Sequence, residues 1–170
     1  KAGCHMLNDI WGLQYKEEPG KMAEVAAESG LPIIVMHNQE GKAYERDIIE
    51  TMKDFFRHTI AIADHAGVPR NNLILDPGIG FGKTPEGNLT VLRRQQELLT
   101  IDGVEYPLLL GTSRKSFIGA ALGLPVDERM EATGATCVVG IMKGAGIVRV
   151  HDVKPIARMC RMTDAILQAD

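Results

Sequence analysis

The stretch from Asn72 to Thr84 reads NLILDPGIGFGKT, and it decides the expected fold. Its first residues are apolar as far as Asp76, as in a strand that is buried on both faces of a sheet. A glycine-rich loop follows, and residues 85–99 then have the apolar spacing of a helix. The stretch therefore predicts a βα unit whose strand ends in a carboxylate.

The same unit recurs along the chain, where short apolar runs alternate with helical patterns. The expected strands lie at 4–9, 31–37, 72–76, 107–113 and 147–152, and the expected helices at 19–29, 45–66, 85–99, 127–143 and 153–168. This alternation predicts an α/β protein with a parallel sheet, and no linker divides residues 1–170, which are expected to form a single domain. Length alone favours a complete doubly wound sheet of flavodoxin type. The alternative is a five-unit arc of a (β/α)8 barrel.

The composition excludes several classes of protein. The 19 Lys and Arg residues nearly balance the 22 Asp and Glu residues, so the chain lacks the basic surface that binds nucleic acid. No apolar run reaches the roughly 18 residues that span a bilayer, and the first residues do not resemble a signal peptide. Cys4, Cys137 and Cys160 are widely spaced and form no CxxC pair. They are expected to be buried thiols in a reducing cytoplasm, not zinc ligands or disulfides.

Every expected strand ends in polar residues, at the edge of a parallel sheet where binding sites form. Asp9, Asn38 and Asp152 are expected to cap the helices that follow them. Asp76 and Arg149 need another explanation, because a charge within an apolar strand is costly without a partner. These two residues are therefore the first candidates for a functional site.

The glycine-rich loop after Asp76 fits neither common nucleotide-binding motif. The Walker pattern needs a glycine at Pro77, and the pattern GxGxxG needs one at Lys83. The glycines still permit positive φ angles and a close approach of the backbone to a ligand. Together, Asp76 and this loop suit a heterocycle with paired N–H donors, and Phe81 is the candidate aromatic contact.

Two further loops place cations at strand ends. Residues 111–119 read GTSRKSFIG, in which Arg114 and Lys115 suit an anion or a carbonyl-rich ligand, with a solvated basic turn as the alternative. The last expected strand, IVRVHD, places Arg149 and His151 on one face just before a helix. A cation, an imidazole and a helix N-terminus together suit an anion. The alternative is an internal ion pair with a core histidine.

These three loops, in this order and at this spacing, resemble the dihydropteroate synthase family. The opening Asn8-Asp9-Ile10 and the strand that ends in Met36-His37 resemble the middle strands of that family. The resemblance runs through the whole chain and implies a TIM barrel, of which this chain would carry the fourth to the eighth strand as a partial barrel. It also implies a transferase of folate biosynthesis that is a sulfonamide target. This enzyme condenses 6-hydroxymethyl-7,8-dihydropterin diphosphate with p-aminobenzoate, forms 7,8-dihydropteroate and releases diphosphate.

The resemblance also implies roles for individual residues. The implied catalytic residues are Asp76, Lys115, Arg149 and His151. The implied substrate-binding residues are Asn8, Ile10, Met36, Asp76, Phe81, Gly111, Lys115, Ser116, Arg149 and His151. Within this set, Asp76 and Asn8 would bind the pterin ring, and Arg149 and His151 would hold the leaving diphosphate. Phe81 and Ser116 would border the aminobenzoate, with Lys115 between the two substrates.

The resemblance further implies Mg²⁺ at the diphosphate, a cytoplasmic protein and a homodimer formed through the last helices. The first three strands of the family, which carry an Asn-containing loop that binds the metal, have no counterpart here, so no metal ligand is expected within this chain. For the same reason the 170-residue chain alone is expected to have little or no turnover. Ile156, Met159, Met162 and Ile166 recur at helical spacing and are expected to be core residues, not interface residues.

Other functions make different predictions. A pterin-binding methyltransferase domain would share the barrel and the pterin pocket, but it would lack the Ser-Arg-Lys-Ser-Phe loop with the Arg-Val-His ending. A non-catalytic piece, such as a subunit that completes a barrel with another chain, would explain the abrupt start at Lys1. A flavodoxin-like binder would have its strands in a switched order, whereas a barrel arc keeps them in sequential order.

Overall fold

The computed structural model describes residues 3–169. Its main strands are β1 (Leu7–Asp9), β2 (Ile33–Met36), β3 (Leu73–Asp76), β6 (Leu108–Leu110) and β7 (Ala145–Val148). Its α-helices are α1 (Lys21–Ser29), α2 (Ile48–Ala66), α3 (Pro85–Arg94), α4 (Ser116–Leu122), α5 (Met130–Met142) and α6 (Val153–Leu167). Short 3-10 helices span Arg70–Asn72, Gln95–Leu98 and Val126–Glu128. None of the helices in this described range is both long and apolar enough to cross a membrane.

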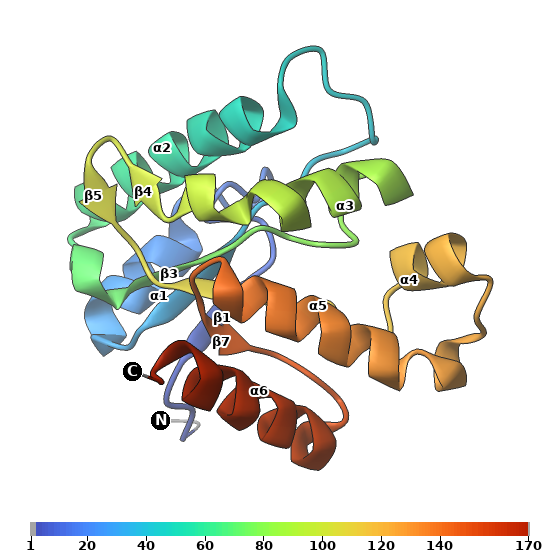
Figure 1. Cartoon of the computed structure of the whole chain (residues 1–170). Helices are drawn as coiled ribbons and strands as arrows, with labels where there is room; N and C mark the ends of the chain where they lie inside the picture. Colours follow the sequence, from blue (N-terminus) through green and yellow to red (C-terminus); the bar gives the residue numbers. More distant parts are fainter. Residues whose placement is uncertain (1–2, 170) are drawn as a thin grey trace.

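The main strands form one parallel sheet in the order β1-β2-β3-β6-β7. Strands that are neighbours in the sheet therefore follow one another along the chain, apart from a separate hairpin of β4 (Thr100–Ile101) and β5 (Val104–Glu105). Figure 1 shows α2, α3, α5 and α6 succeeding one another in the same order from top to bottom. A doubly wound sheet would reverse its order at a switch point. The sequential order confirms the barrel arc and is inconsistent with the flavodoxin-like alternative.

The two faces of the strands pack against different partners. Alternate side chains of the central strands join a large core shared with α1, α2 and α3: Ile33, Val35, Leu73, Leu75, Leu108 and Leu110. The intervening side chains form a separate small cluster: Ile34, Ile74 and Leu109, with Ile147 beside them. This explains the unbroken apolar runs of β2, β3 and β6, because both faces of these central strands are buried.

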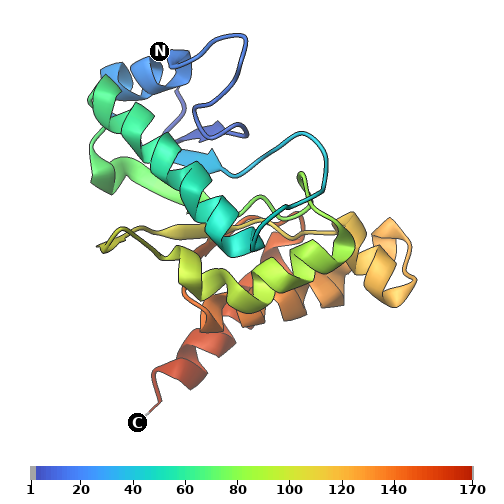
Figure 2. The same cartoon turned by 90° about the horizontal axis from the view of Figure 1, so that it is seen from above.

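The arc has two end strands, β1 and β7. Within residues 3–169, β1 pairs only with β2, and β7 pairs only with β6. In Figure 2 the N-terminal strand and helix lie at the top of the molecule, and α6 ends at the bottom. Because all five strands are parallel, their carboxyl ends lie along the same edge of the sheet from β1 to β7 and can form one continuous rim.

Two elements were not expected from the sequence. Helix α4 begins at Ser116, directly after Lys115, and the hairpin of β4 (Thr100–Ile101) with β5 (Val104–Glu105) lies between α3 and β6. Both elements are too short for a periodic pattern to appear in a window of about 11–18 residues.

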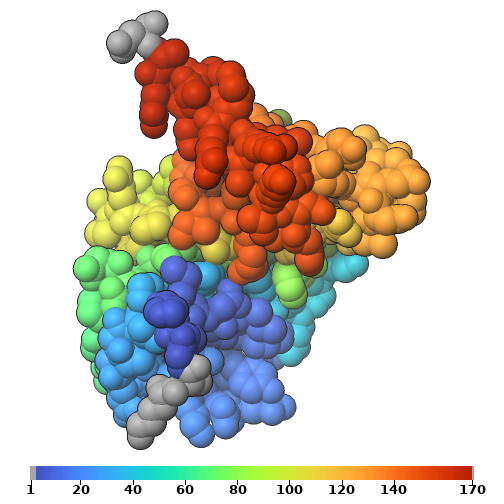
Figure 3. Space-filling view, turned by 90° about the horizontal axis from the view of Figure 1, so that it is seen from below, coloured from blue at the N-terminus to red at the C-terminus, as the bar shows by residue number. Residues whose placement is uncertain are grey.

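The prediction for the last helix is correct for Ile156 and wrong for two other residues. Ile156 is fully buried, whereas Met162 and Ile166 are 60% and 63% exposed. Met159 is partly buried beside Gly134 of α5. Helix α6 packs against α5, but its C-terminal end stands out from the body of the molecule (Figure 3). A helix buries its apolar stripe only along the length over which it is packed.

The three cysteines are free, and they differ in exposure. Cys137 is buried in α5 and Cys160 is partly buried in α6, whereas Cys4 is exposed. The prediction of buried thiols is therefore wrong for Cys4, which precedes β1 and has no packed layer above it.

Candidate functional site

The charged and polar side chains at the strand ends converge on Arg149. This residue follows β7 directly, and its Nη1 donates to Oδ1 of Asn8 in β1 at 2.8 Å. Its Nη2 donates to Oδ2 of Asp76, the last residue of β3, at 2.9 Å. The first, third and last strands of the arc thus meet in one hydrogen-bonded group. Asp76 and Arg149 lie together, as the expected site requires.

Asp76 is the most deeply buried charge of this group. Its side chain is 1% exposed, and burial raises the pKa of its carboxyl above the usual range. The Gly78 N–H, which donates to Oδ1 at 2.8 Å, opposes this shift, as do the charges of Arg149 and Lys115. A buried carboxylate with these partners is a strong acceptor for N–H groups of a ligand.

A pocket of about 260 Å³ lies beside Arg149. It is lined by Gly111, Ser113, Lys115, Arg149, Val150 and His151. Its lining combines cations, an imidazole and a hydroxyl, which suits an anion. Gly111 leaves room for the arginine, because a Cβ there would lie 3.0 Å from Nη2 of Arg149.

Lys115 connects this pocket to the glycine-rich loop after Asp76. Its Nζ donates to the Ile79 carbonyl and lies 4.7 Å from the ring centroid of Phe81. Burial lowers the pKa of Lys115 to about 8, although the negative charge of Asp76 opposes the shift. The lysine, the loop and the buried carboxylate therefore form one electrostatic unit.

The lowered pKa of Lys115 has a measurable consequence for stability. An unfolded lysine titrates near pH 10.4, so between about pH 8 and 10 the unfolded chain binds more protons at this position than the folded chain does. The Lys115 contribution to the free energy of unfolding is expected to rise by about 2 kcal/mol over this interval. Urea unfolding at both pH values should give a smaller rise for Lys115→Met than for wild type. Equal rises would contradict the assignment.

Lys83 is not among the expected site residues, yet its side chain supports the glycine-rich loop. It is 3% exposed, and its Nζ is 3.0 Å from each of Nδ1 of His37, the Gly78 carbonyl and the Phe81 carbonyl. Burial lowers the pKa of Lys83 to about 7, and burial together with the Lys83 charge lowers the pKa of His37 to about 3. The only hint of Lys83 in the sequence is the string Gly82-Lys83-Thr84, which resembles the end of a Walker motif but lacks the glycine that this motif requires at Pro77.

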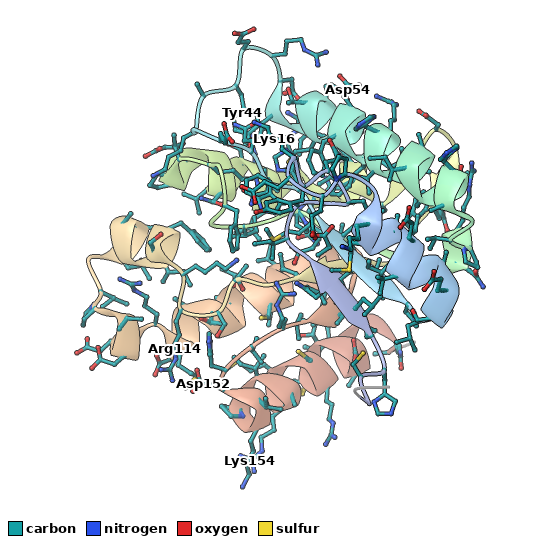
Figure 4. All side chains as sticks on the ribbon, turned by 180° about the vertical axis from the view of Figure 1, so that it is seen from behind. Lys16, Tyr44, Asp54, Arg114, Asp152 and Lys154 are labelled. Carbon is teal, nitrogen blue, oxygen red and sulfur yellow. The ribbon has the colours of Figure 1, made fainter. Side chains whose placement is uncertain are left out.

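An ion pair joins the loop after β6 to the start of α6. Arg114 donates from Nε and Nη2 to the two carboxylate oxygens of Asp152, at 2.9 and 2.7 Å. Figure 4 shows the two side chains next to each other at the start of α6. Asp152 was expected to cap α6, but its side chain makes no capping hydrogen bond. Both carboxylate oxygens of Asp152 bind Arg114 instead of the first N–H groups of α6. The ion pair also joins the loop that carries Lys115 to the segment after β7 that carries Arg149.

The backbone of Arg114 has a left-handed conformation, and the side chains of Thr133 and Arg129 hold it there. Its φ angle is +56°, and its N–H donates to Oγ1 of Thr133 in α5 at 3.0 Å. Nη1 of Arg129 donates to its carbonyl at 3.0 Å. The loop that carries Lys115 is thus fixed by Thr133 of α5 and by Arg129, which directly precedes α5.

Thr133→Val is expected to lower the free energy of unfolding by about 1–3 kcal/mol, because it leaves the N–H of Arg114 without a partner. The matched control is Thr163→Val. Thr163 is also a buried helical threonine, but its hydroxyl donates to the Met159 carbonyl within its own helix at 2.9 Å. The control should change stability by less than about 0.5 kcal/mol. Equal losses in chemical denaturation would argue against the role of Thr133.

His151 is exposed and is oriented by Ser113. Its Nδ1 lies 2.8 Å from Oγ of Ser113, and its backbone N–H donates to the same oxygen at 3.1 Å. Ser113 was recognised as a polar residue at a strand end but not as a site residue. It directs the imidazole toward the pocket that both residues line.

Three of the predicted site residues, Met36, Ile10 and Ser116, do not line the pocket beside Arg149. Met36 is buried opposite Asp76 in the sheet register, and its Cγ lies near Gly78. Ile10 is 44% exposed and lines a separate hollow against α1, outside the Arg149 pocket. Ser116 is exposed at the first residue of α4 and does not line that pocket.

Asp9 and Asn38, which were expected to cap helices, instead bond to backbone N–H groups in the turns directly after β1 and β2. Both carboxylate oxygens of Asp9 accept backbone N–H groups, from Trp11 and Leu13, in the turn after β1. Asn38 accepts the N–H of Gln39 in the loop after β2. Both side chains therefore cap turns, not the helices α1 and α2, which begin many residues later.

The described residues do not form a magnesium site by themselves. Among residues 3–169, no three His, Cys, Asp or Glu side chains lie together in a group that could hold a metal ion. Both oxygens of Asp76 have protein partners, from Gly78 and Arg149. No step proposed below depends on a metal.

Known proteins resemble this chain throughout its length. A sequence model of the family described as pterin binding enzyme matches residues 1–151. The chain is 52% identical to a dihydropteroate synthase of Bacillus subtilis, over 98% of the chain and 56% of that protein. It is 47% identical to one of Clostridium beijerinckii, over 99% of the chain and 60% of that protein. The chain therefore spans somewhat more than half the length of these relatives.

Solved structures agree with the sequence comparison. A Clostridium difficile dihydropteroate synthase crystallised with pteroic acid superposes with a TM-score of 0.91 at 47% identity, covering 98% of this chain and 61% of that one. A Yersinia pestis dihydropteroate synthase with a pterin–sulfa conjugate superposes with a TM-score of 0.89 at 40% identity, covering 98% and 62%. These similarities confirm the partial TIM barrel. Because the family's sequence model matches most of its residues, this chain belongs to the pterin binding enzyme family.

Proposed function

We propose that this chain provides the pterin and diphosphate sites of a dihydropteroate synthase. The observation that carries the proposal is Arg149, which links Asn8 and Asp76 across the strand ends and lines the cationic pocket beside them. A buried carboxylate suits the amino-pyrimidine edge of a pterin, and the pocket suits the anion attached to it. At about 260 Å³ the pocket is smaller than typical ligand sites of roughly 300–1,000 Å³, which fits one part of a substrate.

The proposed reaction substitutes an amine for diphosphate at the methylene carbon of the dihydropterin. The C–O bond breaks with its electron pair leaving on the diphosphate, the amine nitrogen of p-aminobenzoate forms the new C–N bond, and that nitrogen then loses a proton. Arg149 and His151 would stabilise the negative charge that grows on the leaving group. Asp76 would stabilise the positive charge that develops on the pterin side, and no covalent nucleophile is required.

In the free chain the proposed pterin-binding carboxylate of Asp76 and the proposed diphosphate-binding guanidinium of Arg149 are bonded to each other. Oδ2 of Asp76 accepts one hydrogen bond from Arg149, so in the free chain the arginine competes with a pterin amino group for that oxygen. The several negative charges of a diphosphate ester are a stronger partner for a guanidinium than the single charge of one carboxylate. We therefore infer that Arg149 turns from Asp76 to the diphosphate as the substrate binds, which exposes the carboxylate to the pterin.

Lys115, Phe81 and Ser116 would lie on the aminobenzoate side. Lys115 contacts the glycine-rich loop through Ile79 and Phe81, and Ser116 is exposed immediately after it. Homodimerisation and a magnesium requirement remain predictions from the family resemblance. The exposed Met162 and Ile166 on α6 suit the proposed dimer contact.

Calorimetry with two probes tests this proposal. The chain is expected to bind inorganic diphosphate and pteroic acid, with Mg²⁺ present and absent in parallel titrations. A pterin-binding methyltransferase domain would bind the pterin probe without diphosphate, and failure to bind either probe would overturn the proposal. A coupled assay with dihydropterin diphosphate and p-aminobenzoate should show little or no turnover by the chain alone. Native-like turnover would contradict that prediction.

A further inference from the structure

The glycine-rich loop between Asp76 and Lys83 is held by side chains that donate to four of the six carbonyls of residues 77–82. The Gly78 and Phe81 carbonyls accept from Lys83, the Ile79 carbonyl from Lys115, and the Gly82 carbonyl from the Tyr44 hydroxyl. Positive φ angles at its three glycines, Gly78, Gly80 and Gly82, turn these carbonyls in different directions. A sequence of this kind has little shape of its own, so the donors determine its shape.

Lys83 is the donor at the centre of this arrangement. A lysine ammonium has three N–H donors, and Lys83 has three acceptors at 3.0 Å: Nδ1 of His37 and the Gly78 and Phe81 carbonyls. It is 3% exposed, and His37 is 1% exposed, so water does not compete for these bonds. Hydrogen bonds from a charged, buried donor are stronger than those between neutral groups.

The same loop carries the contacts of Lys115. The ammonium of Lys115 bonds to the Ile79 carbonyl and lies over the Phe81 ring, and both of these residues belong to the segment that Lys83 anchors. Lys83 does not line the Arg149 pocket, although the charges of Asp76 and Lys115 act on its ammonium. We propose that Lys83 is a positioning residue that holds the glycine-rich loop in place through the Gly78 and Phe81 carbonyls. Through Ile79 and Phe81, the loop in turn positions Lys115 beside the pterin.

Hydrogen exchange of the intact chain tests the structural half of this inference without a ligand. Lys83→Met keeps the length and the burial but removes all three donors. The Gly80 and Phe81 amides, which donate to Asn88 and to Gly78, are expected to exchange about tenfold faster in this variant. The Val35 amide in β2 should be unchanged. Lys21→Met, at an exposed lysine with 66% side-chain exposure, is the control and should leave all of these amides unchanged. Unchanged exchange in the loop of Lys83→Met would overturn the inference.

Binding tests the functional half, which rests on the proposed function. Lys83→Met is expected to weaken pteroic acid binding about tenfold, while the affinity for inorganic diphosphate changes less than about twofold. An equal loss for both probes would mean a general structural role and would overturn the inference. If wild type binds neither probe, the proposed function fails, and the exchange result decides on Lys83 alone. If Lys83→Met does not fold, Lys83→Gln, which keeps two donors without the charge, is expected to show the same selective loss.

Discussion

Replacing Asp76 by asparagine is expected to weaken the binding of pteroic acid by about 100-fold. Asparagine has the same shape and still offers Oδ1 to the Gly78 N–H, so the turn after β3 should persist. It removes the negative charge that would accept charge-assisted hydrogen bonds from a pterin. In a site where the carboxyl is 1% exposed, such bonds are worth several times what they are worth in water.

The same variant should have the opposite effect, or none, on diphosphate. Without the Asp76 carboxylate, Arg149 loses its 2.9 Å partner and becomes freer to turn toward an anion. Titration calorimetry with both probes therefore gives a characteristic pattern, with the pterin affinity lost and the diphosphate affinity kept or raised. Asp127→Asn, in the exposed turn before α5, is the control and should bind both probes like wild type. Equal pteroic acid affinities for wild type and Asp76→Asn would remove the central residue of the proposed site.

Gly78→Ala is expected to lower the free energy of unfolding by about 4 kcal/mol or more. Gly78 has a φ angle of +65°, and a Cβ there would overlap the carbonyl oxygen of His37. That oxygen belongs to the backbone directly after β2, so it cannot move aside without shifting the sheet. The substitution should also displace the turn at Asp76 and with it the pterin site.

Gly30→Ala separates the clash from the backbone strain. Gly30 caps α1 at a nearly identical φ angle of +64°, but in the described part of the chain a Cβ there would meet no atom within 4 Å. Only the strain of the left-handed conformation applies, about 1 kcal/mol. Chemical denaturation of both variants gives the difference. A loss for Gly78→Ala no greater than that for Gly30→Ala would mean that the loop is free to move away from β2.

The sequence predicted the arrangement of the sheet from its repeating order. Each apolar run became a strand, each helical pattern became a helix, and polar residues stood at the carboxyl ends, where Asp76 and Arg149 meet. This succeeded because burial on both faces leaves a continuous apolar run that is visible in one dimension. The short α4 and the β4–β5 hairpin left no such pattern, and neither did the exposed end of α6.

The sequence could not select the residues that support the site. Lys83 is far from His37 along the chain, yet its ammonium lies 3.0 Å from the His37 ring. From the sequence, Arg114 suits an anion or a carbonyl-rich ligand and Asp152 is expected to cap a helix. Their ion pair is apparent only when β6 and β7 lie side by side. The role of Ile10 in the pterin pocket stays a prediction, because this residue lines a hollow against α1 and not the Arg149 pocket.

Local physical chemistry therefore determined which segments are strands and helices, and which polar residues stand at the rim. Those properties depend on spacing, burial pattern and residue type, all of which are present in the chain before it folds. The tertiary structure alone decided which of the rim residues touch. A glycine-rich loop has no preferred shape until Lys83, Lys115 and Tyr44 donate to its carbonyls, and these donors come together only when separate βα units pack.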